Sequence, residues 1–260
     1  MERLRTERPK GLTTAGLRKW GIIFVLAGIF GRGILQARFL GVTDLNNAEI
    51  LETLTASDAA MMFATVSLGL QFLERCAMPI FCLLLAEGFA NTSDKTRYLL
   101  RVLGVAVISE IPFNYAMSVK FIDMGSRNPA FAMAMTLLLL YLYDYFADKK
   151  FTNTLLKAAF TVAAVFWCAV LRIENGFVCL IITLAFWFFR KKPMIRNLIG
   201  GLASLVGSMF SLFNMAAPMS LVIIHFYNGE KGDENKLMSY LFYPLALSAC
   251  CLVGFVAFGF

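Results

Sequence analysis

Charged residues are scarce in this chain of 260 residues. Asp, Glu, Lys and Arg together make up 16% of it, too few to cover a water-facing surface of normal composition. This shortage excludes a soluble enzyme. The net charge is +7, but the cations stand in short runs between apolar stretches rather than on one basic face. A nucleic-acid partner is therefore not expected.

Histidine and paired cysteine motifs are almost missing as well. His225 is the one histidine, and the six cysteines show no CxxC spacing, so no metal site is expected. All six cysteines fall within apolar stretches, which is typical of small buried side chains. The sequence also lacks a Gly-rich phosphate loop and the HExxH and GxSxG motifs of common hydrolases.

What the chain has in excess is apolar residues, which account for 59% of it and give a mean hydropathy of +0.69. A helix needs about 20 mostly apolar residues to cross the bilayer interior. The sequence predicts an all-α polytopic membrane helix bundle with eight or nine transmembrane helices, forming one membrane domain over residues 1–260. The expected spans are 20–37, 69–90, 98–118, 130–147, 151–171, 177–189, 198–213, 218–227 and 237–258. The span at 218–227 is too short on its own, hence eight or nine.

The distribution of Lys and Arg predicts the orientation, because cytoplasmic segments carry the excess of cations. With the basic N-terminus (1–19) inside, eighteen cations fall in inside segments and four in outside segments. The outside cations are Arg38, Lys120, Arg127 and Arg172. The N-terminus is therefore expected in the cytoplasm, and the C-terminus outside if 237–258 spans fully.

Two stretches have patterns of their own. Residues 41–68 alternate acidic and apolar residues, which predicts an amphipathic helix on the outer surface; a solvated loop is the alternative. Gly200, Ser204 and Ser208 recur every four residues, a small-residue face against which another helix packs closely.

Ionisable residues inside a bilayer are costly and usually have a role. The predicted spans contain Arg32, Glu74, Arg75, Glu87, Arg101, Glu110 and Asp144. At ~1.5 Å per residue, Arg75 and Glu110 lie roughly 18–22 Å deep on neighbouring antiparallel helices, so they are expected to pair. Arg32 reaches a similar depth. Glu87 and Arg101 are expected together near the cytoplasmic face.

The deep pair has two interpretations. It either holds two helices in register or lines a polar cavity with Ser109, Asn114 and Asn128, near prolines that free backbone carbonyls. In such a cavity Glu110 is a candidate acid or base. His225 is a possible alternative base, although it stands alone in an apolar run.

Several motifs resemble those of the TraX family. They are Arg75-Cys-Ala-Met-Pro79-Ile-Phe81, Glu87-Gly88-Phe89, Thr92, Tyr98, Arg101 and Ser109-Glu110-Ile-Pro112-Phe113-Asn114, followed by Asn128, Tyr227-Asn228-Gly229-Glu230-Lys231-Gly232 and Tyr240-Leu-Phe242-Tyr243-Pro244-Leu245. Their order and spacing agree with the family over most of 17–252.

The resemblance implies a membrane acyltransferase of the bacterial cytoplasmic (inner) membrane. The family's type activity is N-acetylation of a conjugative pilin amino terminus with cytosolic acetyl-CoA. Two departures stand out. Relatives usually carry an Asp-His pair where Gly28-Ile29 stand here, and a histidine where Ala246 stands. Without these histidines, the protein must use Glu110 or His225 as base, or it has lost the reaction.

Two functions follow from these residues. The first is acetyl transfer from acetyl-CoA to an amine or hydroxyl acceptor, with Glu110, Arg75 and Ser109 as catalytic residues and Arg97, Arg101 or Lys231 meeting the donor phosphates. The substrate- and cofactor-binding candidates are Arg32, Glu87, Arg97, Arg101, Asn114, Asn128, Asn228, Glu230, Lys231 and Tyr243. The alternative is a catalytically degenerate protein that binds a peptide, lipid or partner protein; a transporter is less favoured. The acceptor and the oligomeric state stay open.

Overall fold

The computed structural model describes residues 11–43, 45–55, 57–146, 150–233 and 235–259. Residues 1–10 of the predicted basic N-terminus lie outside this part. Within the described residues the elements are helices, and the β-bridges are isolated. Five helical runs are long and apolar enough to cross a membrane: Thr14–Phe39, Asp58–Asn91, Lys95–Ser118, Asn153–Val170 and Leu237–Phe258. Three shorter apolar helices accompany them, so the prediction of an all-α membrane protein is confirmed.

The first helical run changes its winding halfway. Helix α1 (Thr14–Gly28) begins where the Thr13 side chain accepts a hydrogen bond from the Gly16 N–H, a normal N-cap. It continues as the π-helix η1 (Ile29–Phe39). Wide π turns are rare and often lie at functional sites. Here the π-helix carries both Arg32 and Arg38 into the bundle.

The second run is broken where one span was expected. Helix α3 (Asp58–Glu74) and helix α4 (Ala77–Asn91) are separated at Arg75 and Cys76. Pro79 lies in the first turn of α4 and has no N–H to continue the ladder from α3, which explains the break. The predicted span 69–90 therefore falls within one helical run, Asp58–Asn91, which begins earlier than predicted and is interrupted at Arg75 and Cys76.

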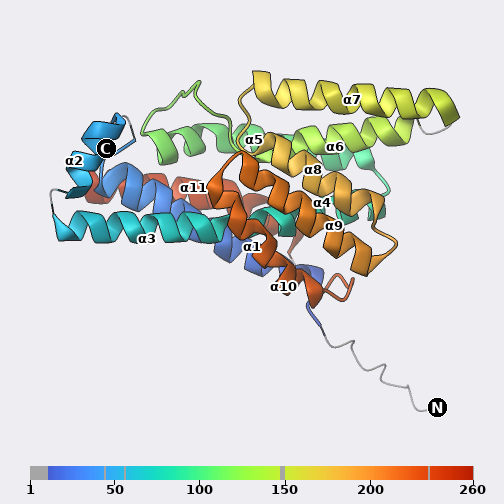
Figure 1. The fold of residues 1–260 in the computed structure, drawn as a ribbon, viewed down its shortest axis with the longest axis horizontal. Helices are drawn as coiled ribbons and strands as arrows, with labels where there is room; N and C mark the ends of the chain where they lie inside the picture. Colours follow the sequence, from blue (N-terminus) through green and yellow to red (C-terminus); the bar gives the residue numbers. More distant parts are fainter. Residues whose placement is uncertain (1–10, 44, 56, 147–149, 234, 260) are drawn as a thin grey trace, which may run out of the picture.

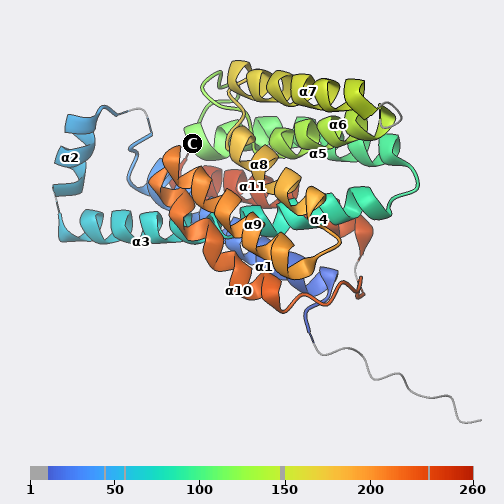
Figure 2. The same ribbon diagram turned by 45° about the vertical axis from the view of Figure 1, so that its right-hand side comes forward.

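The outer segment 41–68 is divided between two helices. The short helix α2 (Asn47–Thr55) has no buried residue, and α3 begins at Asp58 behind an N-cap from Ser57. Figure 2 shows α2 at the far end of α3, away from the other helices. The prediction of one amphipathic helix over the whole segment 41–68 was therefore too long.

Helix α4 packs against α1, α6, α8 and α10, and the remaining helices follow it in the chain. They are α5 (Lys95–Ser118), α6 (Ala130–Tyr145), α7 (Lys150–Val170), α8 (Gly176–Phe188), α9 (Pro193–Val206), η2 (Gly207–Met209), η3 (Leu212–Met219), α10 (Ser220–His225) and α11 (Lys236–Phe258). The main core cluster joins residues of α1, α4, α6, α8 and α10, including Leu17, Ile80, Leu83, Phe186 and Ile224. Helix α7 lies along one edge (Figure 1). The cysteines are free and five of the six are buried, as the sequence predicted.

The small residues of α9 allow close contact with α8. Gly200 and Ser204 are buried, and a Cβ at position 200 would overlap the ring of Phe186. Ser208 is exposed. The predicted packing face is therefore confirmed for the first two of its three positions.

Gly200→Ala is expected to weaken the protein, because Phe186 is fully buried and an overpacked core costs about 1–3 kcal/mol. The measurement is the thermal midpoint in detergent. Gly104→Ala is the matched control, since a Cβ there meets nothing within 4 Å. Equal midpoints for the two variants would contradict the close packing of α8 on α9.

Candidate functional site

A group of charged side chains lies inside the bundle, and we call Arg32, Glu74, Arg75, Glu174 and Tyr243 the deep cluster. Arg32 Nη1 donates to both carboxylate oxygens of Glu174, at 2.8 and 3.0 Å. Arg75 Nη2 lies 3.7 Å from Glu174 Oε1. The Arg32 side chain remains 30% exposed and that of Glu174 17% exposed. Two guanidinium groups thus converge on one carboxylate at a place that solvent still reaches.

Glu174 was missing from the sequence predictions because it lies in a connecting segment between two predicted spans. Its loop is tight, with positive φ at Arg172 (51°) and Asn175 (54°). The loop pairs with the one before α6: the Arg127 N–H donates to the Arg172 carbonyl (2.9 Å), and the Glu174 N–H donates to the Arg127 carbonyl (3.0 Å). The single acidic residue in this short connection was the one available signal.

Glu110 has partners other than the predicted one. It forms an ion pair with Arg127 (2.9 Å) and accepts hydrogen bonds from Asn128, at 2.7 Å from Nδ2 and 3.2 Å from the backbone N–H. The predicted Arg75–Glu110 pair was therefore wrong. The segment after α5 folds back and brings Arg127, counted as an outer cation, to Glu110.

The same segment contains a second fixed carboxylate outside the helices. Asp123 accepts hydrogen bonds from the Ser118 hydroxyl (2.5 Å) and the Gly125 N–H (2.7 Å). These bonds, that of Ser118 first, hold the pKa of Asp123 below its ordinary value. The charged form is favoured because both donors stabilise it. The segment therefore has an ordered turn of its own just before Arg127.

Two further predicted site residues lie on the buried face of α5. Ser109 and Asn114 are both buried, and among the described residues the Ser109 hydroxyl and Asn114 Oδ1 have no hydrogen-bond partner. Phe113 lies between them in sequence, and its ring centre is 5.9 Å from Arg32 Cζ. Because buried polar atoms are normally bonded, these two atoms are available to a ligand.

A second polar group, which we call the shallow cluster, consists of Thr14, Glu87, Arg196 and Tyr227. Arg196 Nη1 lies 3.0 Å from Glu87 Oε1, the Tyr227 hydroxyl donates to Glu87, and Thr14 Oγ1 is 3.0 Å from that hydroxyl. Arg101 is exposed, so the predicted Glu87–Arg101 cluster was wrong. Helix α9, which the sequence could not place in space, supplies the cation instead.

The loop that contains Asn228, Glu230 and Lys231 binds the beginning of α1. The Asn228 N–H donates to the Leu12 carbonyl (2.9 Å), and the carbonyls of Glu230 and Lys231 accept from the N–H groups of Thr14 (2.7 Å) and Ala15 (3.1 Å). The loop thereby satisfies N–H groups that a helix start leaves free. The Lys231 side chain is exposed, as is that of Arg97, which pairs with Asp94 at 3.2 Å.

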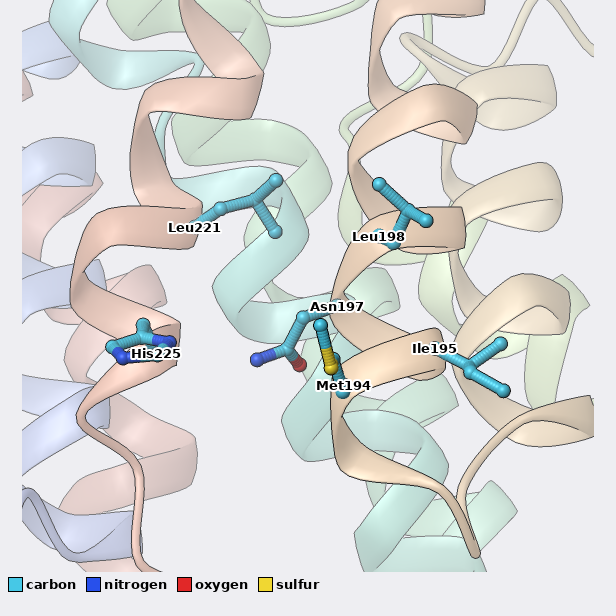
Figure 3. A pocket seen from close by; sticks show the side chains of 6 residues that line it. All are labelled: Met194, Ile195, Asn197, Leu198, Leu221 and His225. Carbon is cyan, nitrogen blue, oxygen red and sulfur yellow. The ribbon is translucent and has the colours of Figure 1, made fainter.

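His225 lies elsewhere, on the last turn of α10. It lines a hollow of about 360 Å³ with Met194, Ile195, Asn197, Leu198 and Leu221. Figure 3 shows His225 and Asn197 on opposite sides of the space between α10 and α9. None of these residues belongs to the deep cluster.

The fold and the deep cluster define a helical membrane protein with a partly exposed charged site in its interior. The chain belongs to the TraX protein family, which it matches over residues 45–254. It is similar to the probable fimbrial assembly protein FimC, serogroup H1, of Dichelobacter nodosus, with 26% identity over 205 residues that cover 70% of this chain and 81% of the relative. No solved structure matches the chain.

The positions that depart from the family pattern meet in space. Ile29 and Ala246 belong to one apolar cluster, together with Phe113 and Leu247. Beside them, a Cβ at position 28 would overlap the carboxyl group of Glu74. The two positions where the resemblance led us to expect histidines therefore belong to one apolar cluster, with the Glu74 carboxyl group beside Gly28.

Proposed function

We propose that this protein is a TraX-type integral membrane acyltransferase that moves an acetyl group from acetyl-CoA to an amine or hydroxyl acceptor at the deep cluster. The observation that carries the proposal is the convergence of Arg32 and Arg75 on one partly exposed site inside the bundle. Charged groups at such depth are costly and are kept for function. The family match includes Arg75, Glu110 and Glu174.

Positive charge at this place suits acyl transfer. Attack on the thioester carbonyl develops negative charge on its oxygen, and a preorganised guanidinium group stabilises that charge. Arg75 is the better candidate for this role. Arg32 already donates to both oxygens of Glu174, whereas Arg75 lies 3.7 Å from that carboxylate. Ser109 and Asn114 offer unpartnered polar atoms for positioning the substrates. Positioning supplies much of the rate when the chemistry is easy.

The direction of access follows from the proposed topology of eight or nine crossings with the N-terminus in the cytoplasm of a bacterial inner membrane. In this proposal the five long and three shorter apolar helices would make eight crossings, and α9 would make a ninth. Acetyl-CoA would then approach the end where Arg97, Arg101 and Lys231 are exposed. The acceptor would approach from the end whose loops provide Arg127 and Glu174.

The name of the relative suggests the class of acceptor. The relative is named a probable fimbrial assembly protein, and on this ground our proposed acceptor is a peptide or pilin amino terminus at the outer face. Such a terminus is a primary amine, which attacks a thioester directly once it has lost its proton.

The test uses membranes that contain the protein and radiolabelled acetyl-CoA, with both bound donor and label transferred to endogenous acceptors measured. Arg75→Ala is expected to retain donor binding and to lower transfer about 100-fold, the usual effect of losing an oxyanion donor. Arg172→Ala, an exposed outer arginine, is the control. Folded wild-type protein that neither binds nor transfers the label would exclude the enzyme.

A second candidate function has one observation in its favour. Ile29 and Ala246 pack in an apolar cluster where the family pattern has histidines, as expected of a protein that binds its partner but has lost the reaction. Donor-independent co-purification of a peptide or membrane protein with both wild type and Arg75→Ala would support this alternative.

A further inference from the structure

Glu74 places a carboxyl group directly against the first helix. It is the last residue of α3, and a Cβ at position 28 would overlap its Cγ, Cδ and Oε2 atoms. Gly28 is buried and is the last residue of α1. The glycine therefore makes room for the carboxylate at the point where the π-helix begins.

The carboxylates at the site differ in the number of hydrogen bonds that their oxygens accept. Glu174 receives two hydrogen bonds from Arg32, and Glu110 is held by Arg127 and twice by Asn128. Among the described residues, no hydrogen bond or ion pair reaches the Glu74 carboxylate. Its charged neighbours at longer range are Arg75, Glu174 and Arg32, and Tyr243 of α11 is also close enough to interact with it electrostatically.

A general base needs a free lone pair close to the reacting proton. The lone pairs of Glu110 and Glu174 accept hydrogen bonds from arginine and asparagine donors. Replacing either carboxylate would therefore first disturb the structure. Glu74 keeps its lone pairs free, and the guanidinium groups of Arg75 and Arg32 lie near it. It therefore meets the requirement better than Glu110, the base that the sequence suggested.

We propose that Glu74 is the general base of the acetyl transfer, an inference that rests on the proposed function. The acceptor nitrogen or oxygen forms a bond to the thioester carbonyl carbon and gives its proton to the Glu74 carboxylate. The C–S bond breaks, and the thiolate of coenzyme A takes up a proton as it leaves. The carboxylic acid then returns its proton to solvent, so the residue is unchanged after each turnover.

The experiment compares wild-type, Glu74→Gln and Glu52→Gln proteins in membranes with radiolabelled acetyl-CoA as the probe. Glu52 is an exposed carboxylate of α2 and serves as the control. Glu74→Gln is expected to bind the donor normally and to transfer label at least about 100-fold more slowly, as when a general base is lost. Loss of donor binding together with transfer would overturn the inference, because Glu74 would then support the fold or the donor site.

The other outcomes are equally decisive. Transfer retained in Glu74→Gln but abolished in Glu110→Gln would reject Glu74 as the base and leave the acyltransferase in place. A wild-type protein that transfers nothing would overturn both the proposed function and the base.

A double variant covers the case in which Glu74→Gln fails to fold. In Gly28→Asp/Glu74→Ala the carboxylate is supplied from α1 into the same space. Transfer above that of Glu74→Ala would support the base, and transfer equal to it would contradict it.

Discussion

Glu174→Ala is expected to lower the free energy of unfolding by about 3 kcal/mol, because removing one partner of a largely buried ion pair leaves the other charge uncompensated. Here the change leaves two guanidinium groups, those of Arg32 and Arg75, without the carboxylate on which they converge. The side chains are 12–30% exposed, so water relieves part of the cost.

The measurement is thermal denaturation of the purified protein in detergent. Glu52→Ala removes an exposed carboxylate and is expected to leave the midpoint unchanged. If Glu174→Ala unfolds at the same temperature as this control, Glu174 does not neutralise the deep arginines. Glu174→Gln is expected to fall in between, since it keeps the shape and a hydrogen-bond acceptor but loses the charge.

Arg38→Met is the second change with a large expected effect. Arg38 is 4% exposed. Its Nη1 donates to the carbonyls of Gly33 (2.6 Å) and Ala116 (2.9 Å), and its Nη2 donates to that of Tyr115 (2.9 Å). Ala116 and Tyr115 belong to the last turn of α5, and the carbonyls of a last turn have no partner within the helix. Arg38 therefore caps α5 with a positive charge at the negative end of its dipole.

Methionine fills a similar volume without donating. Each bond from a charged donor contributes about 1.5–3 kcal/mol, so losing three of them is expected to cost several kcal/mol after relaxation. Proteolysis of detergent-solubilised protein reports the effect, as faster cleavage near the end of α5. Arg172→Met, at an exposed position, is the control, and equal cleavage rates would show that the cap is dispensable.

The sequence was sufficient for the membrane character, most helix positions and part of the set of interior charges, namely Arg32, Glu74, Arg75, Glu87 and Glu110. Hydropathy is a local property, because each helix satisfies its own backbone and only its side chains meet lipid. The ends of α5 and α11 therefore lie within a few residues of their predicted limits. The break at Arg75 was harder to foresee, since Pro79 was read as freeing carbonyls within one continuous span.

The partners of the buried charges were decided by the tertiary structure. Depth counting put Arg75 and Glu110 at one level, but it could not show that two connecting loops fold inward and supply Glu174 and Arg127. Arg38, counted as an outer cation, became the cap of α5 for the same reason. Loops carry no periodicity that predicts their path, whereas a charge in a low-dielectric interior binds whichever opposite charge the folded chain brings closest.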